Sequence, residues 1–496
     1  MRLINTSTLN LELVDNADEH PYAILSHTWG NPSDEVSFQE FQNLDIARQK
    51  RGFTKIQRTC ERAQQQGLKF AWVDTCCIDK SSSAELSEAI NSMFRWYRDS
   101  TICLVFLSDL PADVAFEEGF PGCNWLNRGW TLQELIAPRN VEFYDETWKL
   151  RSSKLEDERL LSRVTGIDTF VLQDSAKLDQ VVVAKRMSWA ARRITTRVED
   201  MAYCLLGIFD INMPMIYGEG SKAFIRLEEE IAKQSCDLSL FAWTAQPSNP
   251  TSCQMYRGIF ARSPEEFANC GQLRNQKKSF TIEKEFAITN KGMRIETTLV
   301  QLIEGPHSDE PILNLGIAEE ENLFPYKPVW MGVYLTKTAF GYVRASPRSI
   351  YTANHEPRYR CRTELLYVRK DVSQLDSHSL ETQYSDAIHV RIHSPLGVNP
   401  GVRINAKPPE LWDERRNLFL TQGSGINAYV FLQFPASMCC PAIELVIACS
   451  TMGEPVCGIW SDQSQMFHNI RYYLKNAKDL SELQCGYRGQ GGQGHN

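Results

Sequence analysis

The stretch Asn127–Arg139 (NRGWTLQELIAPR), which follows the strongly apolar run Thr101–Leu107 (TICLVFL), decides the predicted fold. We expect the first segment to form a short helix that ends at Pro138, because proline cannot continue the backbone hydrogen-bond ladder. The apolar run is typical of a buried strand. A helix that follows the end of a strand lies where open α/β sheets bind their ligands. This segment is therefore the first place to look for a functional site.

Strands and helices alternate on both sides of this segment. Strands are predicted at Tyr22–Ser26, Leu68–Asp74, Thr101–Leu107 and Val141–Asp145. Helices are predicted at Thr54–Gln66, capped by Gly67, from Ser82 to Tyr97, where Ser82 and Glu85 have capping-box spacing, and at Trp130–Ala137. Such alternation implies an α/β domain built on a parallel sheet with right-handed crossovers.

The rest of the chain has a different pattern. Residues 151–240 are expected to be a helical extension, with helices at Ala184–Ile194, at Glu199–Leu206 (stopped by Gly207), and after Gly220-Ser221. Residues 241–485 contain short β-branched and aromatic runs that predict an antiparallel β-rich domain, sandwich- or barrel-like. Those runs are Met293–Val300, Val329–Leu335, Ala387–Ile392, Tyr429–Phe434 and Ala442–Cys449. With an α/β domain at 1–150 and a Gly/Gln-rich, disordered tail at 486–496, four segments are expected.

Composition excludes several classes of protein. The 496 residues are enough for two or three domains, and the net charge of −8 argues against a general nucleic-acid binder. Residues 1–6 lack the apolar core of a signal peptide, and no apolar run approaches the length of a membrane span, so a cytoplasmic protein with reduced thiols is expected. The 15 cysteines form no CxxC…CxxC framework, so no structural metal is expected. Neither a P-loop nor a strand followed by GxGxxG is present, so the sequence predicts no NTPase site.

Several long motifs occur in the order that is typical of one family. They are Tyr22–Gly30 (YAILSHTWG), Trp72–Lys80 (WVDTCCIDK), Ser83–Tyr97 (SAELSEAINSMFRWY), Arg128–Pro138 (RGWTLQELIAP) and Thr195–Gly220 (TTRVEDMAYCLLGIFDINMPMIYGEG). Over about half its length the chain resembles the fungal heterokaryon-incompatibility (HET) domain. The resemblance implies a role in regulated cell death when incompatible fungal cells fuse. It gives no function to the β-rich remainder.

The HET family is itself distantly similar to Toll/interleukin-receptor (TIR) domains, which implies a TIR-like parallel sheet flanked by helices. In that match Ile24–Ser26 corresponds to the first strand, Phe70–Lys80 to the second with its ligand loop, and Ile102–Ser108 to the third. The segment Trp130–Leu135 is similar to the tryptophan, spacer, glutamate-leucine pattern of NAD-cleaving TIR enzymes. The resemblance thus implies that Glu134 is catalytic. Thr131 stands where those enzymes usually have a cysteine.

The chemistry of NAD cleavage suits a carboxylate at this position. Breaking the nicotinamide–ribose bond passes through a ribosyl cation and releases a neutral base, so a nearby carboxylate in a dry site assists more than a strong acid does. NAD would be the substrate, and no further cofactor is required. A structural alternative remains, because Thr131 and Glu134 also have capping-box spacing. Trp130, one helical turn before Glu134, could stack nicotinamide or adenine, or could simply pack in the core.

The remaining candidate residues follow the first two strands, at the edge where open α/β sheets bind ligands. His27 could bond a phosphate or a ribose, or be a structural donor. Lys80 could pair with a diphosphate, and Asp79 could bond a ribose hydroxyl or cap the next helix. Arg128 could reach a phosphate or a surface acid. The predicted nucleotide-binding residues are Ser26, His27, Trp29, Gly30 (expected to permit a turn), Asp74, Asp79, Lys80, Arg128 and Trp130.

A rival interpretation is a non-enzymatic signalling module that associates with itself or docks a protein partner, with the motifs serving packing and interfaces. Under the enzyme hypothesis, Glu134 should line a concave pocket together with His27 and Trp29. The sequence does not choose between hydrolysis and cyclisation of the product.

Overall fold

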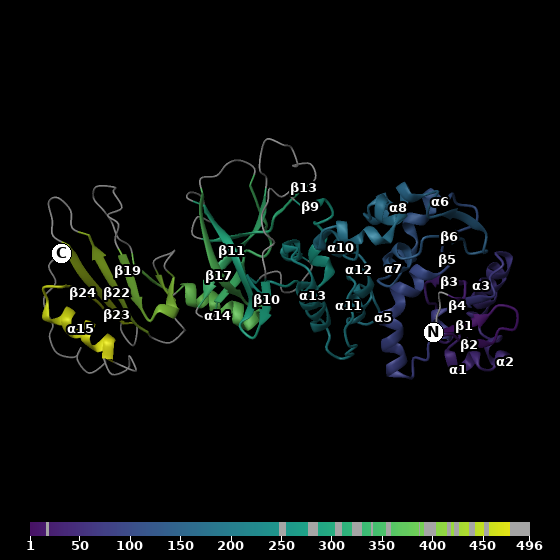
Figure 1. Ribbon diagram of the computed structural model, residues 1–496, viewed down its shortest axis with the longest axis horizontal. Helices are drawn as coiled ribbons and strands as arrows, with labels where there is room; N and C mark the ends of the chain where they lie inside the picture. Colours follow the sequence, from purple (N-terminus) through teal and green to yellow (C-terminus); the bar gives the residue numbers. More distant parts are fainter. Residues whose placement is uncertain are drawn as a thin grey trace.

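The structure is a computed structural model of the 496-residue chain. It describes residues 1–15, 19–247, 254–275, 286–302, 310–319, 330–338, 341–353, 359–385, 387–390, 403–413, 418–420, 426–435, 442–450 and 456–476. The predicted disordered tail at 486–496 lies outside these residues. In the view of Figure 1 the molecule is long, with the N-terminal α/β part at one end and the C-terminal sheet at the other.

The N-terminal part is built on a mixed sheet whose centre is parallel. Strand β3 pairs in parallel with β4 on one side and with β5 on the other, and β5 pairs in parallel with β6. Strands β1, β2 and β7 extend the two edges antiparallel, in the order β2-β1-β4-β3-β5-β6-β7. The strands are β1 (Arg2–Asn5), β2 (Leu11–Leu13), β3 (Tyr22–His27), β4 (Phe70–Trp72), β5 (Ile102–Phe106), β6 (Val141–Tyr144) and β7 (Leu150–Ser153). The parallel centre, β4-β3-β5-β6, has the 2-1-3-4 order of flavodoxin-like doubly wound sheets.

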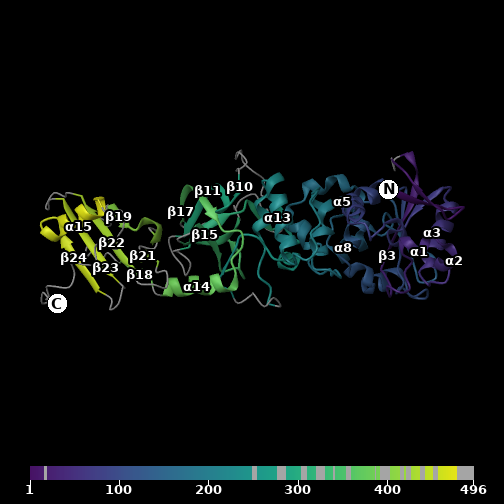
Figure 2. The ribbon, with the colours of Figure 1, turned by 90° about the horizontal axis from the view of Figure 1, so that it is seen from below.

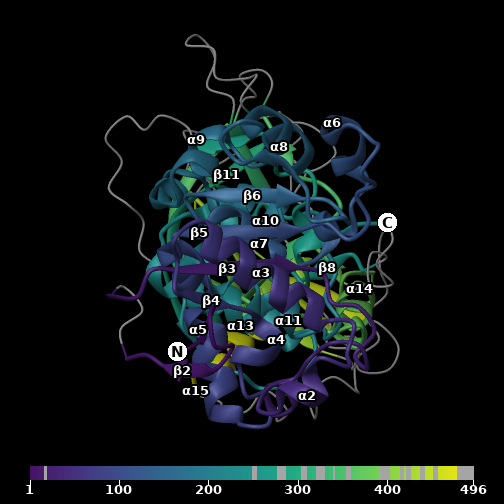
Figure 3. The ribbon, with the colours of Figure 1, turned by 90° about the vertical axis from the view of Figure 1, so that its right-hand side faces the viewer.

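Helices cover both faces of this sheet. Helix α3 (Phe53–Gln65) lies on the outer face, while α5 (Ser83–Asp99) and α7 (Thr131–Ile136) lie on the face turned toward the rest of the chain (Figures 1 and 2). Viewed from the N-terminal end, strands β6, β5, β3 and β4 follow one below another behind α3 (Figure 3). Short helices complete this part: α1 (Phe38–Phe41), α2 (Leu44–Ala47), α4 (Asp74–Cys77) and α6 (Phe116–Gly119).

The predicted central elements are confirmed with small shifts of their ends, and the expected parallel pairing holds for the centre of the sheet but not for its edges. The hairpin of β1 and β2 was not predicted, because strands of four and three residues are too short to show a periodic pattern. Ser82 does accept the backbone N–H of Glu85 as an N-cap, but the Glu85 carboxylate bonds to Arg2 and to the Asp79 N–H. The predicted reciprocal capping box is therefore incomplete.

A helical region packs against the inner face of the sheet. It comprises α8 (Glu158–Thr165), α9 (Thr169–Gln173), α10 (Val183–Ser188), α11 (Asp200–Tyr203), α12 (Leu206–Phe209) and α13 (Lys222–Gln234). The predicted stop at Gly207 is wrong: Gly207 lies inside α12, which ends at Asp210 in the left-handed conformation. Gly207 is required because α12 packs closely on α5, where a Cβ at this position would lie 2.0 Å from the Cβ of Phe94.

The next part of the chain forms a barrel-like sheet. Pairings join β14 to β12, β12 to β11, β11 to β17, β17 to β15 and β15 back to β14, which closes a ring of strands. Strands β16, β8 and β10 attach outside this ring. The strands are β8 (Tyr256–Arg257), β10 (Phe286–Thr289), β11 (Gly292–Leu302), β12 (Ile312–Asn314), β14 (Met331–Thr338), β15 (Gly341–Ala345), β16 (Tyr351–Thr352) and β17 (Tyr359–Val368), with α14 (Gln374–Ser385) after them and a separate pair β9 (Leu273–Asn275) and β13 (Ile317–Glu319). The predicted β-rich architecture is confirmed for this part, but the expected antiparallel pairing does not hold throughout, because β15 and β17 pair in parallel.

The last described part is an open antiparallel sheet of order β19-β22-β23-β24, with α15 on one face. A small sheet, β18-β21-β20, packs on the other face, where Trp412 and Phe419 pair at 4.8 Å. The elements are β18 (Ile388–His389), β19 (Arg403–Lys407), β20 (Trp412–Asp413), β21 (Leu418–Phe419), β22 (Asn427–Phe434), β23 (Ile443–Ser450), β24 (Val456–Ser461) and α15 (Gln465–Asn476). Among the described residues, no helix is both long and apolar enough to cross a membrane.

One apolar core runs through most of these parts. Its buried side chains extend without interruption from Leu3 in β1, through the α/β sheet and the helical region, to Val368 in β17. The C-terminal sheet has separate cores on its two faces. The division of the chain at residues 150, 240 and 485 stays a prediction, but the α/β sheet and the helical region share their interior.

The close packing of α12 on α5 makes Gly207→Ala a specific test. The added methyl group must displace the backbone next to Phe94, so we expect the free energy of unfolding to fall by about 1–3 kcal/mol, the usual cost of overpacking. Urea denaturation measures this. Gly122→Ala is the matched control, because a Cβ at that position meets nothing within 4 Å. Equal denaturation midpoints for Gly207→Ala and Gly122→Ala would contradict this packing.

Candidate functional site

Helix α7 directs Glu134 inward, against the end of strand β3. The Ser26 hydroxyl donates a hydrogen bond to the Glu134 carboxyl, and the Trp125 indole N–H donates to the Ser26 Oγ at 2.8 Å. Glu134 is 9% exposed. No side-chain cap is present at the start of α7, and the Thr131 hydroxyl instead donates to the carbonyls of Trp125 (2.6 Å) and Arg128 (2.9 Å). The capping interpretation of Glu134 is therefore wrong.

Burial changes the protonation of this carboxyl group. Desolvation raises the pKa of Glu134 to about 8; the Ser26 hydrogen bond lowers it, and the nearby Asp74 carboxylate raises it further. The hydroxyl of Tyr97, which donates to the Leu25 carbonyl at 2.9 Å, also contacts Glu134. Glu134 is consequently protonated for the most part at neutral pH. Strongly shifted pKa values of this kind concentrate at functional sites, although buried structural networks produce them too.

A second group of polar side chains, the Trp29 cluster (His27, Trp29, Asp74 and Lys80), lies where strands β3 and β4 end. The Trp29 indole N–H donates to Asp74 Oδ2 at 2.8 Å, and Lys80 Nζ lies 3.7 Å from the centroid of the Trp29 ring. His27 Nε2 is 3.9 Å from Asp74 Oδ1. The parallel strands therefore bring these four predicted site residues together, as expected from their place at the carboxyl ends of the strands.

His27 and Glu134 lie on different faces of the sheet. Successive side chains of a strand point to opposite faces, so Ser26 meets α7 while His27 turns toward the side of α3, near Lys55. Burial, and next the charge of Lys55, lower the pKa of His27 to about 3, so its imidazole is neutral. Both ring nitrogens and Asp74 Oδ1 are buried without a hydrogen bond among the described residues. Buried polar atoms are nearly always bonded, so these three stand out as unsatisfied hydrogen-bonding groups.

A cavity of about 270 Å³ adjoins the Trp29 cluster, with Trp29, Lys80, Glu35 and Thr75 in its wall. Neither Glu134 nor His27 is among the residues that line it. The expectation that Glu134 shares one concave pocket with His27 and Trp29 is thus not met by this cavity. Asp74 is the link between the two groups, because its charge acts on Glu134 and its carboxylate contacts both Trp29 and His27.

Four predicted site residues have other neighbours. Arg128 Nη2 bonds to Thr196 at 3.4 Å and Trp130 bonds to Asp200, so both face the helical region. Asp79 accepts from Gln39 (2.7 Å) and from Ser81, and the next helix is capped by Ser82 instead. Gly30 donates to Glu35 at 2.7 Å; its φ is not positive, so the turn does not require glycine.

Several residues of the site were not predicted from the sequence. Trp125 and Tyr97 come from a 3₁₀ turn and a helix, and they meet Ser26 or Glu134 only in the folded chain. Glu35 and Lys55 form an ion pair at 2.6 Å beneath the turn after β3, where Lys55 also donates to the Thr28 carbonyl. No local spacing in the sequence signals these contacts. Within the described residues, no group of three or more His, Cys, Asp or Glu side chains could hold a metal ion.

The N-terminal α/β part of the chain is similar in sequence to known proteins. Residues 22–118 match the family model described as heterokaryon incompatibility protein (HET). The chain contains a HET domain. It is 50% identical over 221 residues to the vegetative incompatibility protein HET-E-1 of Podospora anserina, an alignment that covers 43% of this chain and 16% of that protein. The chain thus spans less than a fifth of the relative that it matches.

The HET domain is followed by a segment without an assigned role. Residues 222–310, which include α13 and the first strands of the barrel-like sheet, match a domain of unknown function, DUF8212. No solved structure matches the chain.

The shifted pKa of Glu134 has a consequence for stability. Its folded-state pKa of about 8 lies above the ordinary 4.5, so its stabilising contribution is full below about pH 4.5 and is lost as the pH rises through 8. Relative to Glu134→Gln, the wild-type chain should lose up to about 1.4 kcal/mol per pH unit between pH 5 and pH 8. Urea denaturation of both proteins measures this difference. Stability profiles that run parallel over this range would contradict the burial of an ionisable Glu134.

Proposed function

We propose that the chain acts in heterokaryon incompatibility through its HET domain. The proposal is supported by the HET match and by the 50% identity to a protein named for vegetative incompatibility. We further propose that the chain acts in the cytosol as a cell-death effector. The flavodoxin-like order of the parallel strands supports a TIR-like architecture for the domain.

The proposed activity is binding and cleavage of the N-glycosidic bond of NAD or a related nucleotide. The observation that carries it is the Glu134 carboxyl, buried against Ser26 at the carboxyl end of β3 and influenced by Asp74 at the sheet edge. Glu134 would stabilise the ribosyl cation as the nicotinamide leaves. Its protonated ground state fits this role, because the positively charged nicotinamide ring of a bound NAD would lower its pKa and favour the carboxylate.

The Trp29 cluster supplies groups suited to the rest of such a substrate. Lys80 is a cation for the diphosphate, and it already covers one face of the Trp29 indole, so a base would stack on the other face. The unbonded nitrogens of His27 and Asp74 Oδ1 are suited to ribose hydroxyls. In this scheme a ligand reaches Glu134 from the sheet edge past Asp74.

A non-enzymatic, self-associating module is the alternative, and one observation favours it. The Glu134 carboxyl, the Ser26 hydroxyl and the Trp125 indole satisfy one another inside the domain, as a structural network does. In that case the domain would transmit the incompatibility signal through contacts with another copy or a protein partner.

An NAD-consumption assay on the purified full chain separates the two hypotheses. We expect Glu134→Gln to lower the rate about 10²- to 10³-fold, as the loss of a principal electrostatic group does. Glu146→Gln, an exposed glutamate just beyond β6, is the matched control and should keep the wild-type rate. Since the carboxylate is the active form, kcat/KM, which reports the ligand-free chain, should rise with pH toward about 8.

The assay is run on the monomer and on a chemically cross-linked oligomer, because assembly could complete the site. Equal rates for wild type and Glu134→Gln would remove Glu134 from catalysis. If neither form consumes NAD while the oligomer still kills cells, the non-enzymatic alternative holds.

A further inference from the structure

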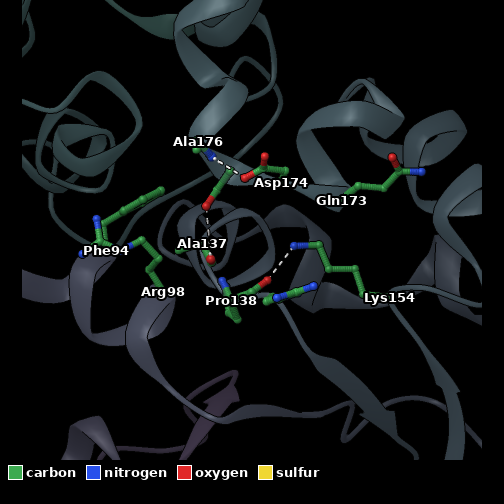
Figure 4. A pocket seen from close by; sticks show the side chains of 10 residues that line it. Phe94, Arg98, Ala137, Pro138, Lys154, Gln173, Asp174 and Ala176 are labelled. Atoms are coloured by element: carbon green, nitrogen blue, oxygen red, sulfur yellow. Dashed lines mark hydrogen bonds between the residues drawn. The ribbon is translucent and has the colours of Figure 1, made fainter. Parts of the chain in front are cut away.

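A second, larger cavity lies at the end of helix α7, at the edge of the sheet where β5 and β6 begin. Its volume is about 550 Å³, within the range of roughly 300–1,000 Å³ that is typical of small-molecule sites. Figure 4 shows Phe94 and Arg98 of α5 on one side, Lys154 on the other, and Asp174 and Ala176 above the turn after α7. Arg139 completes the wall. None of these residues belongs to the proposed catalytic site.

Lys154 is a buried cation without a carboxylate partner. Its side chain is 3% exposed, and Nζ donates to the carbonyls of Ile136 (3.1 Å) and Pro138 (2.7 Å). No acid forms an ion pair with it among the described residues, and burial lowers its pKa to about 7. An ammonium group has three N–H donors, so one remains beyond the two carbonyls. A buried charge of this kind costs free energy unless an anion compensates it.

The charges around the cavity are predominantly positive. Arg98, Arg139 and Lys154 face a single acid, Asp174. The Asp174 carboxylate already accepts the Ala176 N–H at 3.1 Å, where it caps a 3₁₀ turn. Arg98 bonds to its neighbour Asp99 at 2.8 Å, outside the lining, and Arg139 has no ion pair within the part of the chain that the structure describes. Two guanidinium groups and a desolvated ammonium group are the donors that recognise phosphate.

We propose that this Lys154 cavity binds a small molecule through a phosphate or diphosphate group held by Arg98, Arg139 and Lys154. The volume is sufficient for an organic part besides the phosphates, and Phe94 offers an apolar wall for it. The inference goes beyond the proposed function and does not rest on it, because the cavity lies at the edge of the sheet opposite to the Trp29 cluster.

Through Lys154, a ligand in the cavity is coupled to helix α7. Lys154 bonds to the carbonyl of Ile136, the last residue of α7, and to that of Pro138 just beyond the helix. Glu134 lies in the same helix, in its last turn. A phosphate bound to the remaining donor pulls the ammonium group toward the cavity and so weakens its bonds to these two carbonyls. Occupancy of the cavity would therefore alter the end of α7, and with it the placement of Glu134, which is the arrangement of an effector site.

Titration calorimetry of the full chain with inorganic pyrophosphate tests the proposal. We expect saturable binding that Arg139→Ala and Arg98→Ala each weaken about tenfold, the effect of losing one charge-assisted hydrogen bond to phosphate. Arg58→Ala on α3, an exposed arginine on the far face of the sheet, is the matched control and should bind as the wild type does. Arg139 is exposed, and an unchanged Tm of the ligand-free variant shows that the fold is intact.

Two further measurements locate the binding site and identify the class of ligand. Lys80→Ala and Glu134→Gln should keep the pyrophosphate binding that depends on Arg139, whatever their effect on NAD consumption or on any binding at the Trp29 cluster. Failure of the proposed function therefore does not affect this test. Tighter binding of ADP-ribose than of pyrophosphate, still weakened by Arg139→Ala, supports a nucleotide ligand, and equal affinities support the diphosphate alone. The proposal is overturned if pyrophosphate does not bind, or if binding survives Arg139→Ala and Arg98→Ala but is lost in Lys80→Ala.

Discussion

The buried contact between Ser26 and Glu134 is the interaction on which the N-terminal part of the structure depends. A carboxyl group removed from water is costly unless it is hydrogen-bonded, and here the hydroxyl of a central strand provides that bond. The Trp125 indole adds a second bond to the same hydroxyl. The contact thereby fixes α7 against β3 and joins Ser26 to the stretch that holds Trp125 and Glu134, which are 99 and 108 residues further along the chain.

The two-residue alternation of β3 then divides the site into two environments. Ser26 faces the interior beneath α7, where Glu134 is held in its neutral form, while His27 faces the side of α3 and is held neutral by burial and by Lys55. Asp74 lies at the start of a short helix after β4. Its carboxylate contacts His27, and its charge raises the pKa of Glu134. The neutral acid Glu134 and the neutral base His27 thus lie on opposite faces of the sheet, and the Asp74 carboxylate links them. This arrangement differs from the single concave pocket expected from the motifs alone.

The sequence was sufficient for the elements that are buried on all sides and insufficient for those that depend on tertiary contact. The runs Tyr22–Leu25 and Ile102–Phe106 are apolar throughout, so their strands and the placement of His27 near a strand end were predictable. The hairpin of β1 and β2 was not, because it is short and half exposed. Gly207 was misread as a helix stop since its real constraint, the ring of Phe94, is more than 100 residues away. The same holds for Trp125, whose partner Ser26 has no local signature.

The contact of Gly207 with Phe94 also bears on where the domain can be divided. Residues 22–118 are the part that the HET family model matches, but a fragment cut at 118 would lack β6, α7 and Trp125. Ser26 would lose both of its partners, and α5 would expose to water the surface on which α12 now rests. The matched segment is therefore the recognisable portion of a larger cooperative unit. Truncation studies and chimaeras need to carry the chain through α13 if the α/β sheet is to keep its interior.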